Sequence, residues 1–418
     1  MPRNYNNLSE KSKRIGKIYL RSLFDLKTGA NKLSRFLFYL TLEGKMKDPR
    51  IQKIAKNLVN YSTRVQPGDN VLIEYRDNWP LPLVLALIEE VKAAGGRPFV
   101  NFTDMQIQRK LLQAADDEWF DTMCEIDLLR MKKMQAYISI NGRNNSFELS
   151  DVAPEQMKKN TQKYLIPVHL DQRVAHTKWC ILAFPNPSYA QASSMSTEAF
   201  EDFYCDVCSV DYAKMDKAMD PLKELMDKTD KVRLLGPGRT DLTFSIKGLP
   251  GIKCSGQCNI PDGEVFTAPV KDSVNGVIEY NTPTAYHGTK FDKVILTFKD
   301  GKIVKIEGSD VEKLEEIFNT DEGARYVGEF AIGVNPYVTK PMVDILFDEK
   351  ICGSIHFTPG DSYEECPNGN KSGIHWDLVM IQTPEYGGGE IYFDDVLIRK
   401  DGRFVLPELE ALNPENLK

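Results

Sequence analysis

The residues best suited to metal chemistry lie toward the C-terminal end of this 418-residue chain. Two of its five histidines, His356 and His375, fall in strand-like apolar runs at residues 351–357 and 373–381, which a polar loop connects. Side chains at positions i and i+2 of a strand share one face, so His375 and Asp377 are expected to point the same way. An imidazole beside a carboxylate is a ligand pair for zinc, cobalt or manganese. The pattern therefore predicts a metal site, and a hydrogen-bonded core histidine is the alternative.

Two acidic residues lie in apolar surroundings earlier in the chain. Glu264 follows a Pro-Asp-Gly turn and precedes Val265 and Phe266, and Glu329 precedes the apolar run at residues 330–332. A carboxylate among buried side chains is costly unless a metal ion or a cationic group accompanies it. Both residues are therefore further ligand candidates. A buried salt bridge or a solvated strand edge is the alternative for each.

The composition is that of a globular protein, with 42% hydrophobic and 27% charged residues. A chain of 418 residues exceeds one ordinary core, so two domains are expected. The net charge of −7 argues against a nucleic-acid partner. No apolar run approaches the roughly 20 residues that span a membrane, so no membrane partner is expected. With eight cysteines and no visible signal peptide, a cytoplasmic location is expected.

The first 45 residues differ in charge from the rest of the chain. They contain ten lysines and arginines against three acidic residues, while the whole chain is acidic. Their one apolar run, residues 36–42, is too short to cross a bilayer. Residues 1–45 are therefore expected to be a basic extension outside the folded protein, with Met46 resembling a natural start. A basic amphipathic helix that contacts a membrane or a partner is the alternative.

The remainder of the chain predicts a mixed α/β protein, α+β overall, in two domains. Residues 46–230 alternate helical and strand patterns, which is typical of a layered α/β domain with a largely parallel sheet. Strand patterns dominate residues 231–418, with one predicted helix at residues 310–318 and a hairpin signal at Gly301. This second, strand-rich domain contains all the ligand candidates and is the predicted metal-binding domain.

Five strings of residues, in order, carry a resemblance to a known family. The chain resembles the thermophilic metallo-aminopeptidases, of the aminopeptidase T and S type, over about residues 46–418. The strings are IPDGEVFTAP, GEFAIGVNP, LFDEKICGSIH, NKSGIHWDL and FDDVLIRKDGRF. The family is a two-domain, usually dimeric exopeptidase with a dinuclear metal centre, so the resemblance implies a homodimer that acts on peptides.

Position by position, the family's metal ligands fall on Glu264, Glu329, His356, His375 and Asp377. Three carboxylates and two imidazoles without a thiolate suit two divalent ions per chain, Zn²⁺, Co²⁺ or Mn²⁺. Glu329 is the residue expected to bridge them. Two ions about 3.5–4 Å apart can hold a bridging hydroxide, which would attack the first peptide bond and release the N-terminal amino acid.

The family's catalytic tyrosine falls on Tyr363, seven residues after His356. Its phenol would donate a hydrogen bond to the oxygen that becomes negative in the transition state. The loop between His356 and His375 is shorter than in some family members, so the rim of the pocket is expected to differ. An exposed loop tyrosine is the alternative.

Two other functions remain open at this point. Another dinuclear hydrolase, such as a phosphoesterase, would need basic residues around the metals, and only Lys371 lies in the central loop. A non-catalytic, metal-dependent binding protein would be favoured by the loss of Tyr363 or of a ligand, and none of these residues is missing.

Overall fold

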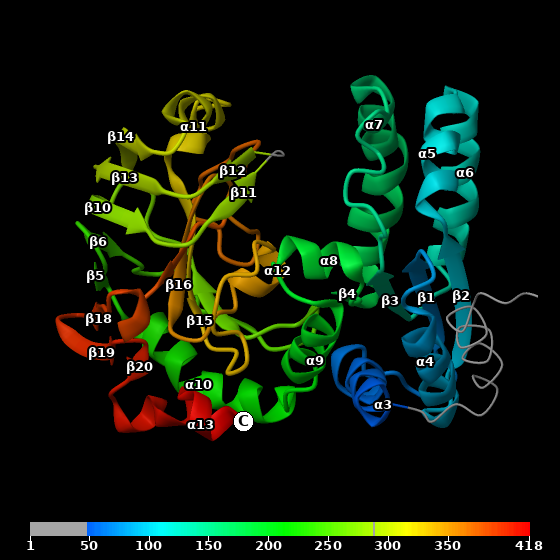
Figure 1. Ribbon diagram of the computed structural model, residues 1–418, viewed down its shortest axis with the longest axis horizontal. Coiled ribbons are helices and arrows are strands. Elements are labelled where there is room, and N and C mark those ends of the chain that lie inside the picture. Colours follow the sequence, from blue (N-terminus) through cyan, green and yellow to red (C-terminus); the bar gives the residue numbers. More distant parts are fainter. Residues whose placement is uncertain (1–47, 287–288) are drawn as a thin grey trace, which may run out of the picture. The chain divides into compact units, whose positions relative to one another are not determined.

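The N-terminal half is built on a parallel sheet, because its strand-forming runs alternate with helices. The computed structural model describes residues 48–286 and 289–418 (Figure 1), so the basic segment 1–45 and His287 lie outside the described residues. The sheet has the strand order β2-β1-β3-β4-β8, and all neighbours pair in parallel. Its strands are β1 (Asn70–Arg76), β2 (Arg97–Thr103), β3 (Ala136–Asn141), β4 (Lys178–Ala183) and β8 (Asn259–Ile260).

Helices connect these strands, and polar side chains cap several of them. They are α3 (Pro49–Lys56), η2 (Asn57–Ser62), α4 (Leu81–Ala93), α5 (Met105–Ala114), α6 (Asp117–Met131), α7 (Pro154–Asn160), η3 (Thr161–Val174), α8 (Pro187–Ala192), α9 (Thr197–Cys208) and α10 (Tyr212–Lys228). The side chains of Asp104, Asp116 and Ser196 accept hydrogen bonds from the first turns of α5, α6 and α9. The sequence did not predict η3, which contains Pro167 and forms a wide helix of the π type.

An antiparallel sheet of eight strands forms the first layer of the C-terminal half. Its strand order is β14-β13-β10-β6-β5-β18-β19-β20. The strands are β5 (Lys231–Leu235), β6 (Asp241–Ser245), β10 (Asn275–Tyr280), β13 (Val294–Lys299), β14 (Lys302–Gly308), β18 (Glu390–Phe393), β19 (Val396–Lys400) and β20 (Arg403–Phe404). The expected hairpin at Gly301 connects β13 to β14.

A second antiparallel sheet, the site sheet, contains three of the five predicted ligands. Its strand order is β17-β16-β15-β9-β7. The strands are β7 (Ile252–Cys254), β9 (Glu264–Thr267), β15 (Val327–Gly333), β16 (Ser354–Pro359) and β17 (Val379–Ile381). The smaller elements are β11 (Thr284–Tyr286), β12 (Thr289–Phe291), α11 (Val311–Phe318), η4 (Gly323–Arg325), α12 (Ile345–Asp348), η5 (Pro384–Tyr386), η6 (Pro407–Leu412) and α13 (Pro414–Leu417).

Aromatic side chains hold the two antiparallel sheets together. Phe244 of β6 lies 5.0 Å, between ring centroids, from both Phe330 of β15 and Phe357 of β16. The hydroxyl of Tyr280 in β10 donates a hydrogen bond of 2.8 Å to the carbonyl of Phe357. Such buried aromatic pairs contribute about 0.5–1.5 kcal/mol each beyond the area that they bury. The strands that carry the site therefore rest on a rigid apolar layer.

The predicted mixed α/β fold class is confirmed, and two expectations about strands near the site are wrong. The strand containing His356 begins at Ser354 rather than at residue 351. Residues 373–381 do not form one strand, because only β17 is regular and His375 forms an isolated bridge with Gly360.

The boundary near residue 230 stays a prediction. Pro49–Lys418 cluster as one compact unit, and β8 joins the parallel sheet from beyond that boundary. No helix among residues 48–286 and 289–418 is long and apolar enough to cross a membrane.

Candidate metal centre

The pairing of β15 with both of its neighbours brings three predicted ligands onto one face of the site sheet. Glu329, Ala331 and Gly333 alternate along β15 and therefore face the same side. Glu264 of β9 lies opposite Gly333, and His356 of β16 lies opposite Ala331. Residues directly opposite in an antiparallel pair share a face. Because alanine and glycine fill little space there, the two carboxylates and the imidazole can approach one another.

The other two predicted ligands lie on the irregular segment before β17, and hydrogen bonds orient both side chains. The ring of His375 donates a hydrogen bond of 2.8 Å from Nδ1 to the carbonyl of Asp361, which leaves Nε2 free to face the centre. Asp377 Oδ1 accepts a hydrogen bond of 2.7 Å from the Thr358 hydroxyl. The segment approaches β16 closely because Gly360, at φ +114°, has no side chain. His375 and Asp377 therefore converge without a regular strand.

The structure brings all five predicted ligands together in two groups that share Glu329. Glu264, Glu329 and His356 form one group, and Glu329, His375 and Asp377 form the other, with ligand atoms within 4.8 Å of one another in each. Glu329 Oε1 lies 3.2 Å from His356 Nε2, and Glu329 Oε2 lies 3.1 Å from His375 Nε2. His375 Nε2 is 3.2 Å from Asp377 Oδ1. One oxygen of Glu329 thus faces each group, while the role of these residues as ligands stays a prediction.

Three buried polar atoms in these groups have no hydrogen-bond partner among the described residues. They are Glu264 Oε2, His356 Nδ1 and His375 Nε2. Buried polar atoms are normally hydrogen-bonded, because leaving one unpaired costs on the order of 1–3 kcal/mol. A divalent cation in each group would satisfy them. The residues present therefore fit the metal ions that a carboxylate and imidazole site prefers.

The carboxylates also dominate the electrostatics of the two imidazoles. Burial disfavours the charged form of His356, but Glu264 and Glu329 outweigh burial and raise its pKa to about 10. Burial has the same effect on His375, and Asp377 and Glu329 raise its pKa to about 11. The site therefore favours positive charge so strongly that it attracts either protons or metal cations.

Glu264 belongs to a cluster of charged residues that was not identified from the sequence. The ammonium of Lys350 donates a hydrogen bond of 2.6 Å to Glu264, forms an ion pair of 2.6 Å with Glu349 and lies 3.5 Å from Asp262. From the sequence, Asp348 and Glu349 read as a charge pair at a helix end, or as groups that orient His356. Both residues do lie at the end of α12, and Asp348 accepts hydrogen bonds from the backbone N–H groups of residues 342 and 343. Lys350 directly follows Asp348 and Glu349 in the sequence, so no local signal distinguishes it from an exposed charged residue.

Tyr363 lies beside the second group, where the resemblance predicts it. Its ring centroid is 4.6 Å from that of His375 and 5.6 Å from that of Phe266. Partial burial of the phenol, together with the negative charge of Glu329 and Asp377, raises the pKa of Tyr363. The phenol therefore keeps its proton at neutral pH and can act as a hydrogen-bond donor at the centre.

Comparison with known proteins identifies the family. The family model of thermophilic metalloproteases (M29) matches residues 47–404, and the chain belongs to this family. Aminopeptidase 2 of Geobacillus stearothermophilus is 24% identical over 413 residues, which cover 85% of this chain and 95% of that protein. The resemblance seen in the sequence is thereby confirmed.

Solved structures share the fold at lower sequence identity. Wild-type AmpT from Thermus thermophilus has a TM-score of 0.70 at 22% identity and covers 86% of this chain and 99% of its own. A 2,5-dihydroxypyridine dioxygenase from Pseudomonas putida KT2440 has a TM-score of 0.55 at 14% identity, over 86% of this chain and 98% of its own. Since proteins of two different names share this fold, the chemistry has to be argued from the site.

Proposed function

We propose that the protein is a dinuclear metallo-aminopeptidase that releases N-terminal amino acids from peptides. The observation that carries the proposal is the pair of ligand groups that share Glu329, because a carboxylate with one oxygen toward each group is arranged to bridge two ions. Membership in the thermophilic metalloprotease family and the name of its relative, Aminopeptidase 2, support peptide hydrolysis.

Charge balance supports two ions rather than one. Five carboxylates lie in or next to the centre: those of Asp262, Glu264, Glu329, Glu349 and Asp377. The ammonium of Lys350 accompanies them. With all five carboxylates ionised and both imidazoles neutral, the formal charge is −4. Two divalent cations neutralise it, whereas one would leave an excess of −2 in a buried site, which is costly.

The chain's own residues divide the chemical work. When bound, the two divalent ions, Zn²⁺, Co²⁺ or Mn²⁺, would supply a Lewis acid and a water molecule that is acidic enough to act as a nucleophile near neutral pH. Glu264 and His356 would hold one ion, and His375 and Asp377 the other, with Glu329 between them. Tyr363 would donate its O–H to the substrate carbonyl oxygen as that oxygen gains negative charge.

The carboxylates beside the centre also give a reason why cleavage would be restricted to the first peptide bond. The free α-ammonium group of a peptide can donate charge-assisted hydrogen bonds to individual carboxylates there. An acylated N-terminus carries no charge and would lose this interaction. Phosphate esters fit less well, because the Lys350 ammonium is already held by carboxylates and the side chain of Lys371 is 70% exposed.

The proposal is tested by hydrolysis of a panel of aminoacyl-anilides and their N-acetylated analogues, with and without a chelator. The expected result is hydrolysis of the free-amine substrates only, lost on chelation and restored by a divalent ion. Equal hydrolysis of acetylated substrates, or preferential hydrolysis of phosphate esters, would contradict the proposed specificity.

A further inference from the structure

Lys350 is a fully buried lysine beside the candidate metal centre. Its side chain is 2% exposed, and its ammonium lies 2.6 Å from one oxygen of Glu264 and 2.6 Å from one oxygen of Glu349. A third carboxylate, Asp262, is 3.5 Å away. Burial of an isolated ammonium costs several kcal/mol, and the surrounding carboxylates offset that cost for Lys350.

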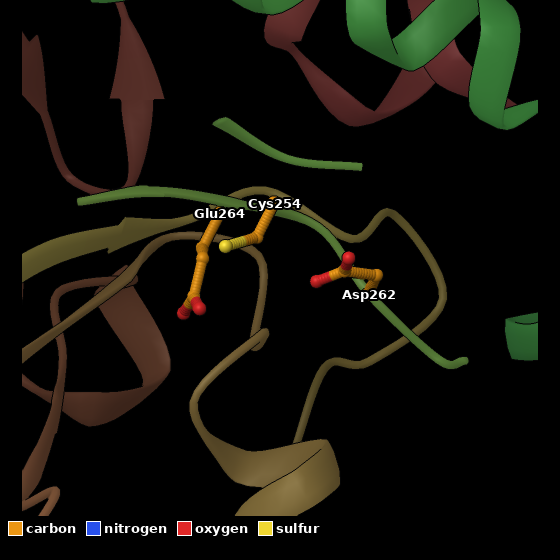
Figure 2. Close-up of side chains that lie close together, drawn as sticks. All are labelled: Cys254, Asp262 and Glu264. Atoms are coloured by element: carbon orange, nitrogen blue, oxygen red, sulfur yellow. The ribbon is translucent and has the colours of Figure 1, made fainter. Parts of the chain in front are cut away.

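The surroundings of that ammonium have the composition of a metal site. Cys254, Asp262 and Glu264 each offer one ligand atom, and the three atoms lie within 4.8 Å of one another (Figure 2). Cys254 of β7 pairs directly with Glu264 of β9, which places both side chains on the same face. Asp262 is held in place by the N–H groups of Gly256 and Gly263. Two of the three, Asp262 and Glu264, direct a carboxylate oxygen at the Lys350 ammonium.

We propose that the ammonium of Lys350 is a fixed cation that occupies a third cation position of the centre. The ammonium donates a hydrogen bond to Oε1 of Glu264. Glu264 therefore presents only its other oxygen, Oε2, to the group that contains His356. Glu264 Oε2 lies 3.6 Å from His356 Nδ1, and both atoms lack hydrogen-bond partners among the described residues. Lys350 is thus a positioning residue, which makes Glu264 a one-oxygen ligand and limits the centre to two exchangeable ions.

This inference rests on the proposed two-ion centre, and its test separates the two. Replacing Lys350 with alanine removes the ammonium and leaves a space beside Cys254, Asp262 and Glu264 that is available to a metal cation. Cadmium accepts both thiolate and carboxylate ligands, and it absorbs in the ultraviolet when a thiolate binds it. Lys350→Ala is therefore expected to bind one more Cd²⁺ per chain than the unmodified protein, with a new sulfur-to-cadmium absorption band.

Two control variants identify the origin of the band. Lys350→Arg keeps a cation in the position and is expected to bind as many ions as the unmodified protein, without the band. The double variant Lys350→Ala with Cys254→Ser removes the thiolate and is expected to lose the band. A purely structural role for Lys350 would not produce a cadmium signal that depends on Cys254.

The number of Cd²⁺ ions that Lys350→Ala binds tests the role of Lys350. A folded Lys350→Ala that binds the same number of Cd²⁺ ions as the unmodified protein, with no new band, would overturn it. If this variant is unfolded without metal, circular dichroism during Cd²⁺ titration decides: refolding by the additional ion supports the proposal, and no refolding in excess Cd²⁺ contradicts it. The ion count of the unmodified protein alone tests the two-ion centre, independently of Lys350.

Discussion

Replacement of Tyr363 with phenylalanine isolates the one predicted contribution to catalysis that comes from a side chain outside the ligand set. The ring packs on His375 and Phe266 at centroid distances of 4.6 and 5.6 Å, and phenylalanine preserves these contacts. Tyr363 is 46% exposed. Among residues 48–286 and 289–418, no group accepts a hydrogen bond from its hydroxyl. Removal of the hydroxyl should therefore change the free energy of unfolding by less than about 0.5 kcal/mol.

The catalytic effect is expected to be much larger than the structural one. Loss of one preorganised donor to a developing oxyanion lowers kcat by about 10²–10³, which corresponds to about 2.7–4 kcal/mol. Because the contact forms mainly in the transition state, KM should change little. The assay is steady-state hydrolysis of an aminoacyl-anilide, with metal content and thermal unfolding measured on the same preparation. A Tyr363→Phe variant with unchanged kcat would remove the phenol from the mechanism.

Three further predictions concern the bridge, the loop and the extension. Glu329→Gln should lose activity and bound metal, because an amide has one acceptor oxygen in place of two; normal ion content by elemental analysis would contradict the bridging role. Gly360→Ala should lower the melting temperature and weaken metal binding, since a Cβ there would clash with the Ile374 carbonyl oxygen and a φ of +114° is strained for alanine; an unchanged Tm would refute this. A chain that starts at Met46 should fold and hydrolyse aminoacyl-anilides like the full chain; an insoluble or inactive product would make residues 1–45 part of the fold.

The sequence predicts the elements well where apolar periodicity is strong. The parallel strands β1 to β4 and the helices α4 to α6 follow the alternation of strands and helices expected for residues 46–230, because buried strands and amphipathic helices differ in their repeat. The wide helix η3 escaped prediction, since it contains Pro167 and many polar residues. The segment around His375 was expected to be a strand, but a hydrogen bond to the Asp361 carbonyl, rather than a regular ladder, orients it.

The residues of the candidate site were predictable from the sequence, but their arrangement in space was not. The sequence points to the five residues that the structure brings together, because histidine is rare in this chain and because carboxylates in apolar runs need partners; their role as ligands stays a prediction. Their division into two groups around Glu329 depends on the register of β15 with β9 and β16, which no local pattern encodes. The cluster of Lys350 with Asp262, Glu264 and Glu349 joins residues almost ninety positions apart and needed the fold to be seen.

The central claim is that two divalent ions, bridged by Glu329, make the protein an aminopeptidase. The most direct measurement is reconstitution of chelator-treated protein with Co²⁺ or Zn²⁺, in which hydrolysis of an aminoacyl-anilide is followed against equivalents of metal per chain. The account predicts negligible activity without metal and a plateau at two equivalents, with no hydrolysis of the N-acetylated substrate at any point. Full activity in metal-free protein, or a plateau at one equivalent, would contradict it.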